Sequence, residues 1–152
     1  MSDVFDLIVV GLGPAGYSAG IYALRYNLNV LMVGNEPGGL ASEPPIIENF
    51  PGFEKISGAD LMAKMNQQYV HLGGKVKVTE VSEIEKNKEV FEIKTTDETL
   101  KSKALILALG TKRRHLNIPG EDKFKGRGVS YCATCDAPFF KDKVVAVIGG
   151  GN

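Results

Sequence analysis

The stretch VFDLIVVGLGPAG, from Val4 to Gly16, decides the fold. Its first seven residues are nearly all apolar and rich in β-branched side chains, which predicts a central parallel strand covered on both faces. Three glycines follow at the spacing G-x-G-x-x-G, and residues 15–27 have the pattern of a helix. A strand, a glycine turn and a helix in this order are typical of a nucleotide-binding unit.

Each glycine has its own role in such a turn. Gly11 permits the tight turn, Gly13 lets the backbone approach a pyrophosphate, and Gly16 allows the helix to pack closely on the strand. The alternative is an ordinary glycine-rich turn. Because position, spacing and flanking residues agree, and because a helix N-terminus favours phosphate charge, we predict nucleotide binding here. The predicted residues are Gly11, Gly13, Pro14, Ala15 and Gly16.

The second strand is predicted at residues 29–33, and an acidic ligand for the nucleotide's ribose is expected near its end. The chain continues Val33, Gly34, Asn35, Glu36, so the acid comes slightly late. We include all four residues in the predicted site. Either Glu36 holds the ribose, or Asn35 and the backbone do. The alternative for Glu36 is a solvated glutamate in a loop.

Two helices are expected to cover the sheet. In the first, Ala19, Tyr22, Ala23 and Tyr26 share one face, which we predict to be its packing face. Residues 34–57 are rich in proline and glycine, and a loop of this length is usually functional. Residues 58–71 resume a helical pattern, with Ser57 or Asp60 as the candidate cap. The inward residues predicted for this second helix are Leu61, Met62, Met65 and Tyr69.

The rest of the chain is expected to complete the first domain and begin a second. Residues 75–81, 90–94 and 99–100 alternate apolar with polar, which predicts a small antiparallel meander, and residues 104–109 resemble a buried strand. Residues 112–127 are interpreted as a crossover. Residues 143–148 predict a second buried strand that runs into Gly149 and Gly151, a second glycine turn. We therefore expect domains at 1–114 and 115–152 and a chain that is the N-terminal portion of a longer protein.

The two cysteines, Cys132 and Cys135, are separated by two residues and followed by Asp136. Three interpretations compete for this C-x-x-C pair: a redox-active disulfide, half of a zinc site and two inert thiols. Zinc needs about four N or S ligands, and His71 and His115 lack ligand spacing, so no metal site is predicted. A helix N-terminus favours thiolate, and Asp136 is placed to donate or accept a proton or to cap the helix. Redox chemistry is the preferred interpretation.

The charge composition points to no particular partner. Lys plus Arg and Asp plus Glu number 18 each, so the net charge is zero and gives no sign of nucleic acid or of an anionic membrane. The N-terminus has no signal-peptide pattern, and we expect a cytoplasmic protein. In a reducing cytosol a C-x-x-C pair is more often catalytic or metal-bound than structural.

These segments together resemble the low-molecular-weight, FAD-containing thioredoxin reductases. The resemblance covers essentially the whole chain. It implies a Rossmann-like FAD-binding domain, with a parallel sheet and a small meander, followed by the start of a truncated second Rossmann-like domain that carries the C-x-x-C pair. The segments that carry it are GLGPAGY (11–17), IENFPGF (47–53), LGT (109–111) with IPGE (118–121), FKGRGVSYCATCD (124–136) and VAVIGGGN (145–152).

The resemblance also implies cofactors, partners and roles. FAD would be held by the first glycine turn with Gly39, Leu40, Asn49, Val81 and Gly110, and NADPH by a second site that includes Gly149 and Gly151. Electrons would pass from NADPH through FAD to the dithiol and then to a thioredoxin-like protein, in a homodimer. Cys135 would face the flavin, Cys132 would attack the substrate disulfide, and Asp136 would be the proton donor.

Two departures and two alternatives accompany this resemblance. Leu40 stands where many members have glutamine, and Leu109 where threonine is common, which fits members that take electrons from donors other than NADPH. One alternative function is the reductase component of an alkyl hydroperoxide reductase system, which normally carries an N-terminal thioredoxin-like extension. The other is a non-catalytic nucleotide-binding or redox-sensing module.

Overall fold

The computed structural model describes residues 4–150, with the side chains of Thr134 and Cys135 excepted. The chain divides into two compact units, one up to Thr111 and one from Lys112 onward. None of the described helices is long and apolar enough to span a membrane.

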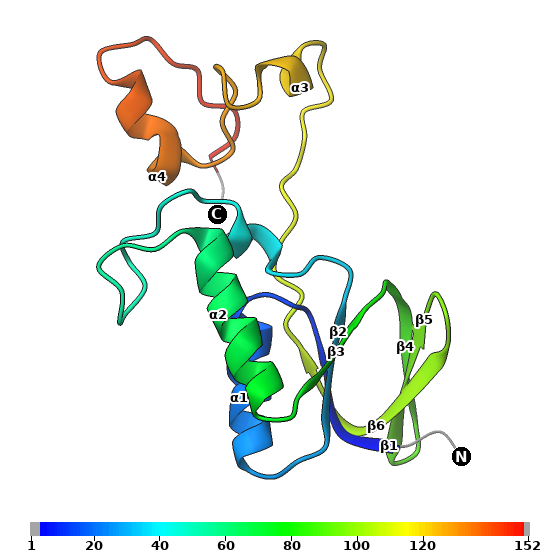
Figure 1. The fold of residues 1–152 in the computed structure, drawn as a ribbon. Helices are drawn as coiled ribbons and strands as arrows, with labels where there is room; N and C mark the ends of the chain where they lie inside the picture. The colour runs from blue at the N-terminus through cyan, green and yellow to red at the C-terminus, as the bar shows by residue number, and fades with distance from the viewer. Residues whose placement is uncertain (1–3, 151–152) are drawn as a thin grey trace. The chain divides into compact units, whose positions relative to one another are not determined.

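The first unit is built on a mixed six-stranded sheet with the strand order β3-β2-β1-β6-β5-β4 (Figure 1). Strands β3, β2, β1 and β6 run parallel, and β6, β5 and β4 are antiparallel neighbours. The strands are β1 (Val4–Val10), β2 (Val30–Gly34), β3 (Lys75–Val78), β4 (Val81–Asn87), β5 (Val90–Thr95) and β6 (Thr99–Leu107).

Two helices of the first unit, α1 (Pro14–Arg25) and α2 (Gly58–His71), pack side by side on one face of the sheet (Figure 1). Of the two candidate caps of α2, the structure selects Ser57, whose Oγ accepts a hydrogen bond from the Asp60 amide at 3.0 Å. The other helical segments are η1 (Gly39–Ser42) in the first unit and α3 (Glu121–Phe124), α4 (Ala133–Asp136) and η2 (Ala137–Phe140) in the second.

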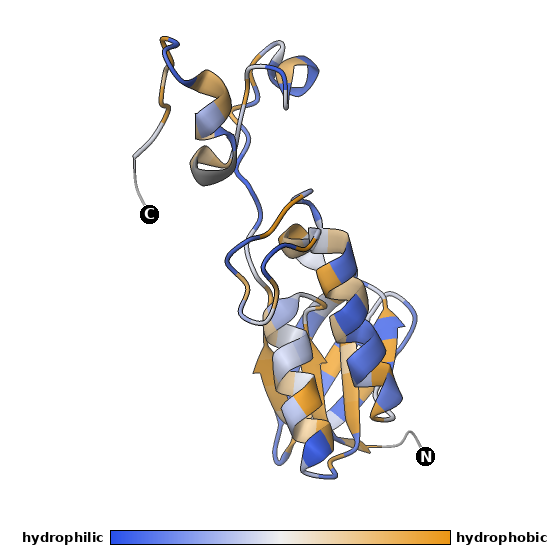
Figure 2. Ribbon diagram, turned by 60° about the vertical axis from the view of Figure 1, so that its left-hand side comes forward, coloured by the Kyte–Doolittle hydropathy of each residue, from blue (hydrophilic) through white to orange (hydrophobic). Residues whose placement is uncertain are grey.

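The core lies on both faces of the sheet, as the continuous apolar character of β1 requires. Leu7 and Val9 pack with the helices, whereas Ile8 and Val10 belong to a second cluster on the opposite face. This alternation follows from the period of two in a strand. Figure 2 shows apolar residues concentrated on these strands and polar residues on the outer sides of the helices.

The predicted packing face of α1 is wrong in part. Tyr22 and Tyr26 are exposed, and the residues that face the core are Gly16, Tyr17, Gly20 and Ala23. The reason is the close approach of α2: a Cβ on Gly20 would lie 2.7 Å from the ring of Tyr69. A helix face with small residues leaves room for a large aromatic ring from a neighbouring helix. The spacing of large apolar side chains does not predict such a face.

Tyr69 shows how well the sequence pattern identified the face of α2. Its side chain is fully buried, and its hydroxyl donates to the carbonyl oxygens of Lys75, at 3.1 Å, and Val30, at 3.3 Å. Burial raises the pKa of this phenol above its ordinary range. Leu61 and Met62 are buried as predicted, and Met65 packs against the same cluster.

The predicted meander needs a correction in its first strand. Residues 75–81 do not form one antiparallel strand, since β3 pairs parallel with β2, and β4 begins at Val81 and pairs antiparallel with β5. The predicted strands at 99–100 and 104–109 belong to one strand, β6, which ends at Leu107. The predicted burial of its second half is wrong, because Ile106 and Leu107 are exposed. Its first half pairs with β5 on one side, while β1 runs along its other side for nearly its full length. Alternation alone does not say which neighbour a strand has.

In the second unit the predicted strand at 143–148 is not formed. Residues 144–150 have no regular secondary structure, and Val144, Val147 and Ile148 are exposed. The physical reason is that a strand is stable only when its backbone groups pair with a neighbour. Within residues 112–150 the structure contains no sheet that would provide one.

One buried polar group in the sheet supports a stability prediction. Ser102 on β6 is fully buried, and its hydroxyl has no hydrogen-bond partner. Removing an unsatisfied buried hydroxyl should not cost stability, so Ser102→Ala is expected to raise the free energy of unfolding by up to about 1 kcal/mol. Urea denaturation followed by circular dichroism measures this change.

The matched control is Ser82→Ala on β4, where an exposed hydroxyl donates to the Lys94 carbonyl oxygen at 3.3 Å. We expect its effect to stay within about 0.5 kcal/mol. A loss of more than about 1 kcal/mol in Ser102→Ala would contradict the prediction, since it would mean that the hydroxyl makes a stabilising hydrogen bond.

Candidate functional site

The carboxyl ends of three parallel strands meet at the first glycine turn. The amide of Gly11, just after β1, donates to the Val33 carbonyl oxygen of β2 at 2.8 Å. The amide of Ala108, just after β6, donates to the Val10 carbonyl oxygen at 2.8 Å. Ligands of open α/β sheets bind at this edge, because the loops that follow the strands converge there.

Two of the three fingerprint glycines are required by packing. Gly11 has φ +123°, and a Cβ there would lie 2.0 Å from the Ala108 carbonyl oxygen. A Cβ on Gly16 would lie 2.1 Å from the Gly11 carbonyl oxygen. Both distances are far below van der Waals contact, so only glycine allows the turn and helix to sit this close to the strands.

Gly13 is different, because nothing lies within 4 Å of the position its Cβ would take. It is also the N-terminal cap residue of α1, where no side chain accepts a hydrogen bond from the first turn, and Pro14 follows it. An uncapped helix start next to an open glycine leaves backbone N–H groups and the positive end of the helix dipole available to an anion. The residues present therefore fit a pyrophosphate.

A second turn lies against the fingerprint. The Gly38 amide donates to the Leu12 carbonyl oxygen at 2.8 Å, and the Gly39 amide donates to the Glu36 carbonyl oxygen at 3.0 Å. A Cβ on Gly39 would lie 3.9 Å from the Gly13 Cα atom. Gly38, which adopts φ +86°, was missed by the sequence reasoning, although its place in a Pro-Gly-Gly run was the available signal.

The four predicted cofactor residues at the end of β2 differ in their exposure and contacts. Asn35 and Glu36 are exposed directly after β2, whereas Val33 is fully buried, so only its backbone faces the turn. Gly34, at the end of β2, accepts from the Thr79 amide at 3.0 Å.

Four further predicted residues lie outside this cluster of contacts. Asn49 is exposed in the segment before α2, and Val81 packs against the second core cluster at the start of β4. Gly110 follows β6 with φ +64°. Leu40 lies in η1, next to Gly39. Their part in a cofactor site stays a prediction.

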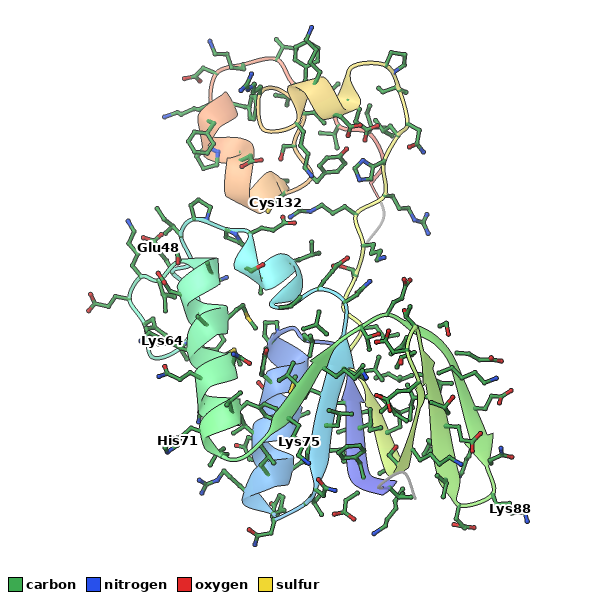
Figure 3. All side chains as sticks on the ribbon, turned by 45° about the vertical axis from the view of Figure 1, so that its right-hand side comes forward. Glu48, Lys64, His71, Lys75, Lys88 and Cys132 are labelled. Carbon is green, nitrogen blue, oxygen red and sulfur yellow. The ribbon has the colours of Figure 1, made fainter. Side chains whose placement is uncertain are left out.

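The C-x-x-C segment lies in the second unit, where Cys132 directly precedes α4 (Figure 3). No free thiol occurs among the residues that the structure describes. Cys135 is in α4, but its side chain lies outside the described residues, and so does Gly151 of the second glycine turn. Gly149 is described and has φ +94°. The dithiol pairing stays a prediction.

The segment before Cys132 is held by a buried carboxylate that the sequence reasoning did not identify. Glu121 is only 5% exposed and accepts hydrogen bonds from the backbone amides of residues 116–118, at 2.9, 2.7 and 3.4 Å. The Tyr131 hydroxyl donates to the same carboxylate, and His115 Nδ1 lies 3.4 Å from it. His115 therefore faces a carboxylate and a phenol.

These hydrogen bonds make the second unit sensitive to pH. The Tyr131 hydroxyl and the backbone amides hold the pKa of Glu121 down at about 2, from an ordinary value of 4.5. Because the folded pKa is depressed, the stabilisation is complete above about pH 4.5 and is lost as the pH falls toward 2. Glu121 in turn raises the pKa of Tyr131 to about 12, so the phenol stays protonated at neutral pH.

We expect the amides of Leu116 and Asn117 to lose protection from hydrogen exchange as the pH falls from about 4.5 to 2. Protection factors measured by NMR at several pH values give the profile. Glu121→Gln is the control, because its amide does not titrate and should show no transition in this range. Protection that stays constant down to about pH 1.5 in the wild-type chain would contradict the prediction.

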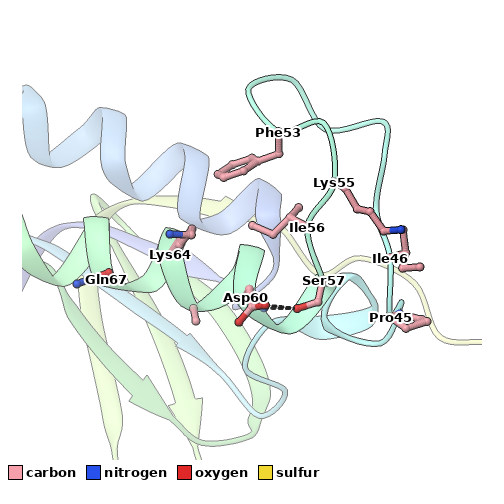
Figure 4. A pocket seen from close by; sticks show the side chains of 10 residues that line it. Pro45, Ile46, Phe53, Lys55, Ile56, Ser57, Asp60, Lys64 and Gln67 are labelled. Carbon is pink, nitrogen blue, oxygen red and sulfur yellow. Dashed lines mark hydrogen bonds between the residues drawn. The ribbon is translucent and has the colours of Figure 1, made fainter.

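One pocket of about 580 Å³ lies in the first unit, between the 45–57 segment and α2 (Figure 4). Its lining includes Pro45, Phe53 and Ile56 with the two cations Lys55 and Lys64. The Ser57–Asp60 hydrogen bonds that start α2 lie at its edge. None of the predicted site residues lines this pocket, so the candidate site rests on the glycine turns instead.

Comparison with known proteins agrees with this geometry. Residues 5–152 match the profile of the family described as pyridine nucleotide-disulphide oxidoreductase. Thioredoxin reductase of Ureaplasma parvum is 42% identical over 151 residues, which are 99% of this chain and 49% of that protein. The chain thus spans about half the length of the curated relatives it matches.

Two solved structures extend the likeness to the fold. The thioredoxin reductase of Streptococcus pyogenes is 38% identical with a TM-score of 0.81, over 92% of this chain and 46% of that one. A ferredoxin-flavin thioredoxin reductase from Clostridium acetobutylicum is 34% identical with a TM-score of 0.67, over 92% and 49%. The chain has a Rossmann-like fold, belongs to the pyridine nucleotide-disulphide oxidoreductase family, and within it is similar to thioredoxin reductases.

Proposed function

We propose that this chain is part of a flavin-dependent disulfide oxidoreductase that passes electrons from a reduced donor, through FAD and a Cys132/Cys135 dithiol, to disulfides of thioredoxin-like proteins. The observation that carries the proposal is the first glycine turn. A Cβ on Gly11 or Gly16 would lie only 2.0 or 2.1 Å from a backbone carbonyl oxygen, while Gly13 is open at an uncapped helix start. Such a turn serves a dinucleotide, and the family match adds disulfide chemistry.

FAD is the proposed cofactor, because the turn fits a pyrophosphate, and it would supply the two-electron chemistry of the reaction when bound. The N-terminus of α1 and the Gly13 backbone would hold the pyrophosphate, and Asn35 or Glu36 would hold the ribose. Gly39, whose Cβ position is 3.9 Å from the Gly13 Cα atom, would contact the cofactor as well, and Leu40 follows it in η1. The assignments of Asn49, Val81 and Gly110 rest on the resemblance.

The dithiol would act on the protein substrate by thiol exchange. The Cys132 thiolate attacks one sulfur of the substrate disulfide, the substrate S–S bond breaks, and the departing sulfur leaves with the electron pair and a proton from Asp136. Asp136 then takes the proton of Cys135, whose thiolate attacks the Cys132 sulfur. The second substrate sulfur leaves as a thiolate and takes that proton, so two electrons and two protons reach the substrate.

Besides NADH, the electron donor has two candidates. NADPH is the first, with Gly149 and Gly151 contributing to its site. Ferredoxin is the second, because Leu40 and Leu109 depart from the common residues, and because one similar structure is named a ferredoxin-flavin thioredoxin reductase. The proposed domain division at 114/115, the homodimer and the cytoplasmic location complete this proposal.

Anaerobic titration of the native protein tests the proposal. The protein is purified with FAD and mixed in turn with NADPH, NADH and reduced ferredoxin while the flavin absorbance is followed. We expect one donor to bleach the flavin, and thioredoxin disulfide to restore the oxidised spectrum. Bleaching restored only by a peroxidase partner would favour the alkyl hydroperoxide reductase alternative. Failure to bind FAD or to be reduced by any donor would favour a non-catalytic module.

A further inference from the structure

Ser130 lies two residues before Cys132, and its hydroxyl connects both ends of the dithiol segment. Ser130 Oγ donates to Asp136 Oδ2 at 2.6 Å and accepts from the Cys132 amide at 3.1 Å. The Cys132 carbonyl oxygen, at 3.3 Å, competes for the same hydroxyl proton. Because a bond to a carboxylate is stronger and this one is shorter, the proton points to Asp136.

The helix that carries Asp136 is too short to fix this side chain by itself. Helix α4 consists of four residues, and the Asp136 amide donates to the Cys132 carbonyl oxygen at 3.0 Å. A single turn gains little stability of its own, and an aspartate side chain rotates about two torsions. The hydrogen bond from Ser130 selects one direction for the carboxylate relative to the Cys132 backbone.

The position of Ser130 is in turn anchored through its neighbour. The Tyr131 hydroxyl donates to the buried Glu121 carboxylate and lies 3.1 Å from His115 Nδ1. The Tyr131 and His115 rings also contact each other, with centroids 5.2 Å apart. Tyr131, which lies between Ser130 and Cys132, is thus held by Glu121 and His115, two residues that precede it in the chain. These contacts keep Ser130 in place.

We propose that Ser130 is a positioning residue for proton transfer at the dithiol. It rests on the proposed function, in which Asp136 protonates a departing sulfur. Ser130 acts through Asp136: its hydroxyl keeps the carboxyl group directed so that the sulfur leaving with its electron pair receives the proton as the S–S bond breaks. Nothing in this role requires Ser130 to contact the substrate.

The experiment compares two disulfides with different needs for a proton. The reduced protein is mixed with oxidised glutathione, whose alkyl thiolate must be protonated, and with dithiobis-nitrobenzoate, whose aromatic thiolate leaves without a proton. We expect Ser130→Ala to slow the reaction with oxidised glutathione about 10-fold and to change the aromatic reaction by less than about twofold. Ser130→Thr, which keeps the hydroxyl, should restore the rate, and Ser82→Ala should not change it.

A double-mutant cycle adds the second readout. If Ser130 acts through Asp136, Ser130→Ala should not slow the glutathione reaction further in an Asp136→Asn background. Equal slowing with both disulfides, multiplicative effects in the double variant, or no slowing at all would each overturn the proposal. The measurement needs no flavin reduction, so a native protein that fails with every electron donor can still show the Ser130 effect.

Discussion

Gly11→Ala and Gly16→Ala are expected to unfold the first unit or to destabilise it by more than about 4 kcal/mol, a large part of a typical domain's stability. In each variant the new Cβ meets a backbone carbonyl oxygen at about 2 Å, and at Gly11 the positive φ adds strain. Backbone atoms cannot rotate away as a side chain can. Thermal unfolding followed by circular dichroism measures the loss.

Gly13→Ala is the matched control, because its Cβ meets nothing and its φ of −92° suits any residue. We expect its melting temperature to lie within about 3 °C of the wild type, and its affinity for FAD to fall about 10-fold or more where the methyl group meets the pyrophosphate. A Gly11→Ala chain that melts like the wild type would contradict the steric argument. Unchanged FAD affinity in Gly13→Ala would remove this turn from the cofactor site.

Cys132→Ser and Cys135→Ser are each expected to lower the rate of disulfide reduction by at least about 1,000-fold. The reason is that a serine hydroxyl neither attacks the substrate disulfide nor forms a disulfide itself. FAD content and flavin reduction by the donor should stay at the wild-type level, since the glycine turns are untouched. Turnover with thioredoxin disulfide and flavin absorbance are measured on the same samples. Wild-type turnover in the double variant would refute the role of the dithiol.

A control for the cysteine variants is the donor-dependent reduction of ferricyanide, a small acceptor that needs only the flavin. We expect this activity to persist in both variants. If it is lost together with disulfide reduction, the serine substitutions have damaged the flavin site and the test must be repeated with alanine at the same positions.

Much of the first unit was predictable because its signals are local. The apolar run of β1 and the amphipathic pattern of α2 mark both elements with the bounds that the structure has. The Ser57 cap and the inward position of Tyr69 follow from the same pattern. The glycine spacing indicated the turn, although the difference between locked Gly16 and open Gly13 needed coordinates.

The structural features that the sequence did not predict depend on contacts between residues that are distant in the chain. A local sequence pattern does not identify such contacts. The inner face of α1 is lined by glycines because Tyr69 fills the space beside Gly20. The parallel pairing of β3 depends on its neighbour β2, and alternation is the same in both orientations. Burial of Glu121 depends on Tyr131 and on backbone amides, so charge alone predicts it to be exposed.

The irregular segment 144–148 has a practical consequence for work with this chain. Val144, Val145, Val147 and Ile148 are more than half exposed, and the run contains no charge or proline. Short apolar segments with high β-propensity and open backbone groups associate with one another and form the seeds of aggregates. Aggregation of the 152-residue chain should therefore increase with protein concentration, and Val147→Lys should improve recovery from expression without touching the first glycine turn.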